Sequence, residues 1–124
     1  MAEPQVTALA ERIRFLLQAE PGIGEIPMFG SWCFTINGNM LCGPDKSGAL
    51  MLRVGPARHE EALSQAHVRQ MDFTGRPMRG YVFVDAPAIA TDAQLSYWLD
   101  VGKAFVTALP AKEKKAKTVS RKTR

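Results

Sequence analysis

The sequence predicts a single α+β domain in which helices cover an antiparallel sheet of about five strands, in the order α-βββ-α-ββ-α. Three observations support this prediction. Hydrophobic residues repeat every three to four positions near the N-terminus and then alternate after Pro21-Gly22. The pair Asn37-Gly38 is typical of a tight β-hairpin, and Thr91 with Gln94 matches a capping box before a second long periodic segment. The chain has 124 residues, of which 46% are hydrophobic and 23% charged, as expected for one folded domain.

The first element is predicted to be a helix. Its buried face consists of apolar residues with helical spacing, namely Val6, Leu9, Ala10, Ile13, Leu16 and Leu17. Pro21-Gly22 ends the helix, because proline lacks an N–H donor and glycine frees the backbone.

Three strands are predicted to follow as a meander. Residues 32–36 alternate and are rich in residues that favour strands. Asn37-Gly38 then reverses the chain, since a type I′ turn needs positive φ at both central residues. Residues 39–43 return and residues 49–54 form the third strand, while residues 26–28 are a candidate start of an earlier one.

The second half repeats the alternation of helix and strand. Residues 58–67 have helical content, and residues 69–73 and 78–84 are expected to pair as strands. The last helix begins after Thr91 and ends before Pro110. Its buried face is expected to contain Leu95, Trp98, Leu99, Gly102, Phe105, Val106 and Leu109. Because tight turns join consecutive strands, we expect an antiparallel sheet with one face covered by the helices.

The positive charge is concentrated at the C-terminus. The whole chain carries +4, but residues 112–124 carry +6, which leaves −2 for the rest. The basic residues of this tail are Lys112, Lys114, Lys115, Lys117, Arg121, Lys122 and Arg124. We therefore expect a folded domain over residues 1–110 and a basic, disordered tail over residues 111–124. The tail is expected either to bind nucleic acid weakly and without sequence preference or to keep the protein in solution.

The two cysteines are close together in the predicted hairpin. A two-residue turn at Asn37-Gly38 places Cys33 opposite Cys42, with Cα atoms about 4.5 Å apart, near the short limit of disulfide geometry. They form either a redox-sensitive cross-strand pair or two reduced, buried thiols. A structural zinc site usually needs four ligands. His59 and His67 lie out of phase on the predicted helix, so we expect no metal.

Six further residues are candidates for a binding surface. Large apolar side chains beside a glycine could form the lip of a pocket or simply part of the core. Arginines on the predicted strands and in the turn before the last strand could hold an anion or line a solvated face. The candidates are Met28, Phe29, Trp32, Arg53, Arg76 and Arg79.

No catalytic motif is visible in the sequence. There is no nucleophile elbow and no Walker loop, and Gly22-Ile23-Gly24 lacks the third glycine and the preceding strand of a dinucleotide fingerprint. We therefore expect no enzymatic activity and no cofactor. The N-terminus lacks a secretory pattern and no apolar stretch approaches 20 residues, so we expect a cytoplasmic protein with no membrane contact.

Several segments together resemble the N-terminal domain of the TfoX/Sxy family. They are Met28-Phe29-Gly30, residues 36–40, residues 50–54, residues 72–78 and the closing helix at about residues 91–109. The resemblance covers roughly residues 8–109 and implies an α/β domain of the predicted order. It also implies a non-enzymatic relative of regulators of natural competence, which contact protein partners and carry a second, C-terminal domain. Only the tail follows here, so we expect a stand-alone N-terminal domain.

Three alternatives remain open at this stage. The chain could instead be a small-molecule or peptide-binding module that uses the face or the edge of its sheet. It could also be an enzyme of unrecognised type, which would require a concave site where His59 or His67 meets a thiol or a carboxylate. An exposed strand edge is often paired with another chain, which makes a homodimer an option.

Overall fold

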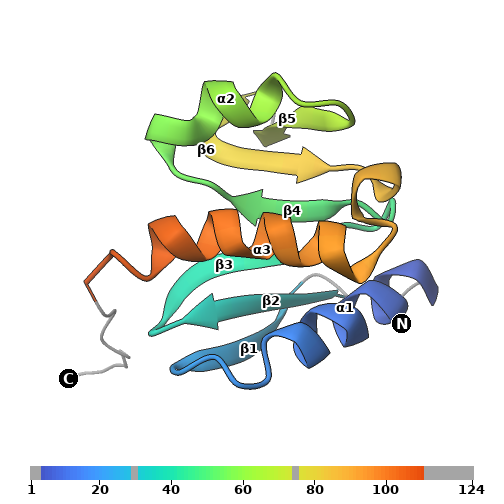
Figure 1. Ribbon diagram of the computed structural model, residues 1–124, viewed down its shortest axis with the longest axis vertical. Helices are drawn as coiled ribbons and strands as arrows, with labels where there is room; N and C mark the ends of the chain where they lie inside the picture. The colour runs from blue at the N-terminus through green and yellow to red at the C-terminus, as the bar shows by residue number, and fades with distance from the viewer. Residues whose placement is uncertain (1–3, 29–30, 74–75, 111–124) are drawn as a thin grey trace.

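Two layers make up the domain, a sheet and a set of helices packed on one of its faces (Figure 1). The computed structural model describes residues 4–28, 31–73 and 76–110. Within these residues there are three α-helices and one six-stranded antiparallel sheet with the strand order β1-β2-β3-β4-β6-β5. The predicted fold class is therefore confirmed, with β1 as the sixth strand.

Helix α1 spans Pro4–Leu16 and buries the predicted apolar face. Val6, Leu9, Ala10 and Ile13 are all buried, and Leu17 continues the same face just beyond the helix. The remaining face of α1 carries charged residues that reach other elements, so the helix is held both by its core contacts and by ion pairs at its rim.

The meander has four strands, β1 (Ile23–Met28), β2 (Ser31–Ile36), β3 (Asn39–Pro44) and β4 (Leu50–Arg53). The turn between β2 and β3 has φ values of 53° at Asn37 and 83° at Gly38, as the type I′ prediction requires. Strand β1 begins three residues earlier than the sequence pattern indicated. It includes Pro27, which is tolerated because β1 is an edge strand and needs no further partner.

After β4 the chain leaves the sheet through two short helical segments and then returns to it as two more strands. A 3-10 turn at Pro56–Arg58 leads into α2 (His59–Leu63), which is shorter than the predicted helix and is followed by a turn with φ 67° at His67. Strand β5 (Val68–Phe73) forms the outer edge, and β6 (Arg76–Val84) inserts between β5 and β4. This order places Val82 and Val84 beside Leu52 and Leu50, so that four fully buried side chains lie together.

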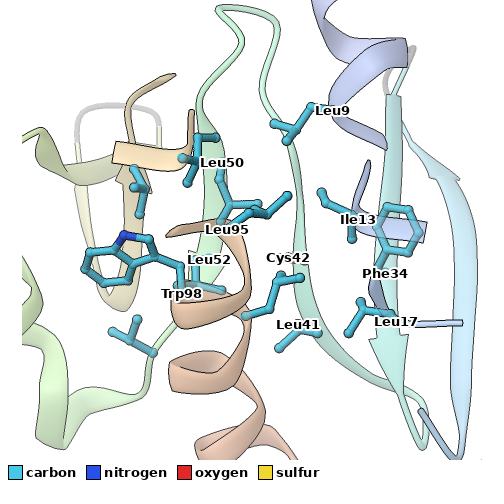
Figure 2. Close-up of a cluster of buried hydrophobic side chains, with 14 of the residues drawn as sticks. Leu9, Ile13, Leu17, Phe34, Leu41, Cys42, Leu50, Leu52, Leu95 and Trp98 are labelled. Carbon is cyan, nitrogen blue, oxygen red and sulfur yellow. The ribbon is translucent and has the colours of Figure 1, made fainter. Parts of the chain in front are cut away.

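Helix α3 (Asp92–Val106) lies across the middle of the sheet, after the short 3-10 helix η2 (Ala86–Ile89). Thr91 caps it through the predicted capping box with Gln94. Its apolar face meets α1 and the central strands in one continuous core, shown in Figure 2. The labelled core residues are Leu9, Ile13, Leu17, Phe34, Leu41, Cys42, Leu50, Leu52, Leu95 and Trp98.

Candidate binding surfaces

The face of the sheet opposite the helices is not covered by any described helix. Phe34, Leu52 and Val82 point into the core beneath the helices, so their neighbours along each strand point to the other face. The strand register arranges these neighbours in rows that cross the sheet. We call this surface the open face, and its larger side chains are Ile26, Met40, Met51, Arg53, Arg69, Tyr81 and Phe83.

The open face is apolar at its centre. Met51 pairs with Phe83 across β4 and β6, and both side chains are partly exposed. Ile26, on the β1 edge, is 48% exposed. Solvated sheet faces usually carry polar residues, so methionine, isoleucine and aromatic side chains are unusual on a face that no described helix covers.

Two arginines frame this apolar centre in different ways. The guanidinium of Arg69 lies 5.0 Å from the ring centroid of Phe83 and forms a two-pronged ion pair with Asp85, with an Nε–Oδ2 distance of 2.9 Å. This hydrogen bonding lowers the pKa of the Asp85 carboxyl. Arg53 instead lies between the rings of Tyr81 and Phe105, at 5.6 and 5.4 Å from their centroids. Its charge is therefore held by aromatic faces, and no described carboxylate forms an ion pair with it.

The three predicted binding residues whose side chains the structure describes, Trp32, Arg53 and Arg79, do not gather into one surface. Trp32 lies on the helix side, where the guanidinium of Arg14 is 5.9 Å from its ring, and it packs against the core. Arg53 lies at the opposite end of the sheet, because Trp32 is near the β1–β2 turn and Arg53 ends β4. Arg79 is exposed and 3.8 Å from Glu60. The Met28 and Arg76 side chains, and Phe29 entirely, lie outside the described residues.

The predicted register of the cysteine hairpin is wrong. The pairs Ile36–Asn39 and Thr35–Met40 form as expected, but a bulge follows and Phe34 then pairs with Cys42. One extra residue on β3 therefore turns Cys42 into the core with Phe34, while Cys33 faces the open side. Both thiols are free and buried, and burial raises the pKa of each. The geometry that favoured a redox pair is absent.

The two histidines differ in their burial and in their contacts. His59 is 4% exposed, and its Nδ1 accepts a hydrogen bond of 2.9 Å from the backbone N–H of Gly80. It thus ties α2 to β6, a structural role that the sequence did not reveal. His67 is exposed in the turn before β5. Among the described residues, no three His, Cys, Asp or Glu side chains gather as a metal site would require.

A surface groove of about 610 Å³ lies between the turn before β5, η2 and the first half of α3. Tyr97 forms one wall and is 49% exposed, with its ring 5.0 Å from that of Trp98 in an edge-to-face arrangement at 75°. Gln65 donates a hydrogen bond of 3.3 Å to the Tyr97 hydroxyl. The sequence marked Trp98 only as a core residue, since its spacing on the helix does not reveal the opening beside it.

The basic tail leaves the domain at a defined point. Pro110 is the last described residue, and its carbonyl accepts a hydrogen bond of 2.9 Å from the side chain of Asn39. The described part of the chain therefore ends beside the turn between β2 and β3. Its seven basic residues, from Lys112 to Arg124, lie outside the described residues.

The helices and the six-stranded antiparallel sheet define a two-layer α+β domain. The family model of the TfoX N-terminal domain matches residues 16–105, and the chain belongs to this family. No match is found among curated proteins or among solved structures. In the part of the chain that the structure describes, no helix has the length and apolar character needed to cross a membrane.

Proposed function

We propose that this chain is a non-enzymatic regulatory or adaptor domain of the TfoX type that contacts a protein partner through the open face. The observation that carries this proposal is the set of apolar side chains on the face that no described helix covers, with Met51 and Phe83 at its centre and Ile26 at its β1 edge. Family membership and the likeness to competence regulators support a role in controlling transcription. The separation of His59 from the Cys33 thiol supports the absence of catalysis. His59 Nδ1 already accepts a hydrogen bond from the backbone N–H of Gly80, and Cys33 lies on the open face of the sheet.

The partner contact can be tested with a charge placed in the open face. We expect Met51→Glu to lose a partner that the wild-type chain recovers from its own cells by affinity purification, because a carboxylate beside Phe83 would have to be desolvated in the interface. Ala104→Glu is the matched control, since Ala104 is exposed on α3. Circular dichroism should show that both variants are folded. Equal recovery by wild type and Met51→Glu would contradict the proposal.

We further propose that the tail adds weak, sequence-independent affinity for nucleic acid. Its net charge of +6 contrasts with −2 for the rest of the chain, so electrostatic attraction to phosphates comes from this segment. Neutralising about six phosphates would give a slope of about −5 for log K against log salt concentration.

Fluorescence anisotropy with a labelled duplex can test the tail. Replacing its seven basic residues by glutamine keeps its length and should abolish binding at low salt. A tail of the same composition in scrambled order should bind as well as the wild type, since the attraction depends on charge alone. Unchanged binding by the glutamine variant would refute this part.

A further inference from the structure

The indole of Trp98 carries a buried donor without an acceptor. The residue is 4% exposed, and among the described residues no acceptor forms a hydrogen bond with its Nε1–H. Buried indole N–H groups usually find a partner, because an unpaired buried donor destabilises the folded state. Figure 2 shows the ring extending sideways from α3, away from Phe34 and Ile13. Trp98 also lines the groove beside Tyr97. A bound ligand could therefore supply the missing acceptor.

A second donor stands at the rim of the same groove. The Tyr97 hydroxyl accepts a hydrogen bond from Gln65, which leaves its own proton free among the described residues. The edge-to-face contact between Tyr97 and Trp98 holds the two donors on adjacent rings. Two donors without an acceptor among the described residues therefore lie on adjacent aromatic rings that line the groove.

The rest of the lining limits the chemistry of the ligand. Among the residues that the structure describes, neither lysine, arginine, aspartate nor glutamate lines the groove, so a phosphate would lack an ammonium or guanidinium partner there. The remaining lining residues are small and apolar or carry uncharged or imidazole groups, namely Gln65, Ala66, His67, Pro87, Ala88, Ala93 and Gln94. An uncharged ligand with apolar surface and exposed carbonyl oxygens fits this lining, and the volume lies within the range of ligand sites.

The backbone conformation of a peptide ligand can also be inferred. A helical peptide uses most of its carbonyls internally, and a peptide that adds a strand needs a sheet edge, whereas this groove lies on the helical layer. A polyproline II segment has no internal hydrogen bonds, so its carbonyls are free and its rings pack on aromatic faces.

We propose that this groove binds an extended, proline-containing peptide segment, with the Nε1–H of Trp98 and the hydroxyl of Tyr97 donating hydrogen bonds to its backbone carbonyls. The site lies in the helical layer, away from the open face. The adaptor domain would thus have a second contact for a partner.

Nuclear magnetic resonance can test this site in the full chain. The sequence contains two tryptophans, so a ¹⁵N-labelled sample has two indole signals, which Trp32→Phe assigns. We expect titration with acetyl-hexaproline-amide to shift the Trp98 Nε1–H signal saturably and to leave the Trp32 signal unchanged. A glycine-serine peptide of the same length should cause no such shift. Absence of a saturable Trp98 shift, or an equal response to the glycine-serine peptide, would overturn the proposal.

Variants separate hydrogen bonding from packing. Trp98→Phe keeps an aromatic ring but removes the donor, and should weaken binding roughly tenfold, as expected for the loss of one hydrogen bond. Tyr97→Ala provides an independent check if Trp98→Phe does not fold, because Tyr97 is half exposed, and it should abolish binding. Met51→Glu should bind the peptide like the wild type, which distinguishes failure at this groove from failure at the open face. Unchanged affinity in Tyr97→Ala would contradict the assignment.

Discussion

Gly55 is expected to be one of the least replaceable residues of the domain. It follows β4 with φ 89° and ψ 153°, a backbone region that is essentially restricted to glycine. A β-carbon at this position would lie 2.4 Å from Cδ1 and 2.7 Å from Cγ of the Phe105 ring. Gly55→Ala therefore combines backbone strain of about 1–3 kcal/mol with overpacking of about 1–3 kcal/mol. The expected loss is roughly 2–6 kcal/mol, a large part of the 5–15 kcal/mol that stabilises a typical domain.

Gly48 offers a matched control for the strain alone. Its φ is 91°, yet a β-carbon there would meet only the Gln5 side chain at 3.4 Å, an ordinary contact. Gly48→Ala should therefore lose less stability than Gly55→Ala. Urea unfolding followed by circular dichroism measures both free energies.

The double variant Gly55→Ala with Phe105→Leu tests the clash. Removing the ring should make the double variant more stable than the sum of the two single losses predicts. A Gly55→Ala variant within 0.5 kcal/mol of the wild type, the usual range for a neutral surface change, would refute the reasoning.

Three further predictions concern the thiols, the acid response and the last helix. Cys33 and Cys42 should both stay unreactive toward a thiol reagent in the native protein at neutral pH and react after denaturation, because burial raises the pKa of each; rapid native labelling of Cys42 would contradict its place in the core. Arg69 lowers the pKa of Asp85 in the folded state. The ion pair therefore stabilises the protein at pH values above the unfolded-state pKa of about 4, and this contribution is lost as the pH falls through the lower folded-state pKa. Asp85→Asn should therefore cost about 0.5–1 kcal/mol at pH 7, given its partial exposure, and progressively less in urea unfolding as the pH is lowered below about 4; a cost that does not change with pH would exclude the ion pair as the cause. Thr91→Ala should lose about 1 kcal/mol of unfolding free energy and Thr91→Ser much less, since serine keeps the capping oxygen; equal losses would argue against the cap.

Much of the fold follows from short-range patterns in the sequence. The buried face of α1 depends on spacing along one helix, the turn at Asn37-Gly38 on backbone preferences of two residues, and the start of α3 on the box formed by Thr91 and Gln94. Each of these features needs only residues close in sequence. The family resemblance rested on the same segments and is confirmed by the match over residues 16–105.

The candidate sites could not be predicted from the sequence alone, because they depend on contacts between residues that lie far apart along the chain. The bulge in β3, which turns Cys42 away from Cys33, arises in the pairing of two strands. The extent of β1 was hidden because Gly24 and Pro27 disfavour an interior strand but suit an edge.

The sequence by itself determined the helices, the turns, the antiparallel class and the charge of the tail, because these depend on local spacing and composition. Only the tertiary structure decided which face of the sheet stays open, that Arg53 stacks between two rings, and that Trp98 borders a groove with an unpaired donor. The physical reason is that β6 inserts between β4 and β5 while the helices gather on one side. Side-chain exposure is set by this arrangement of distant segments, which the spacing of residues along the chain does not determine.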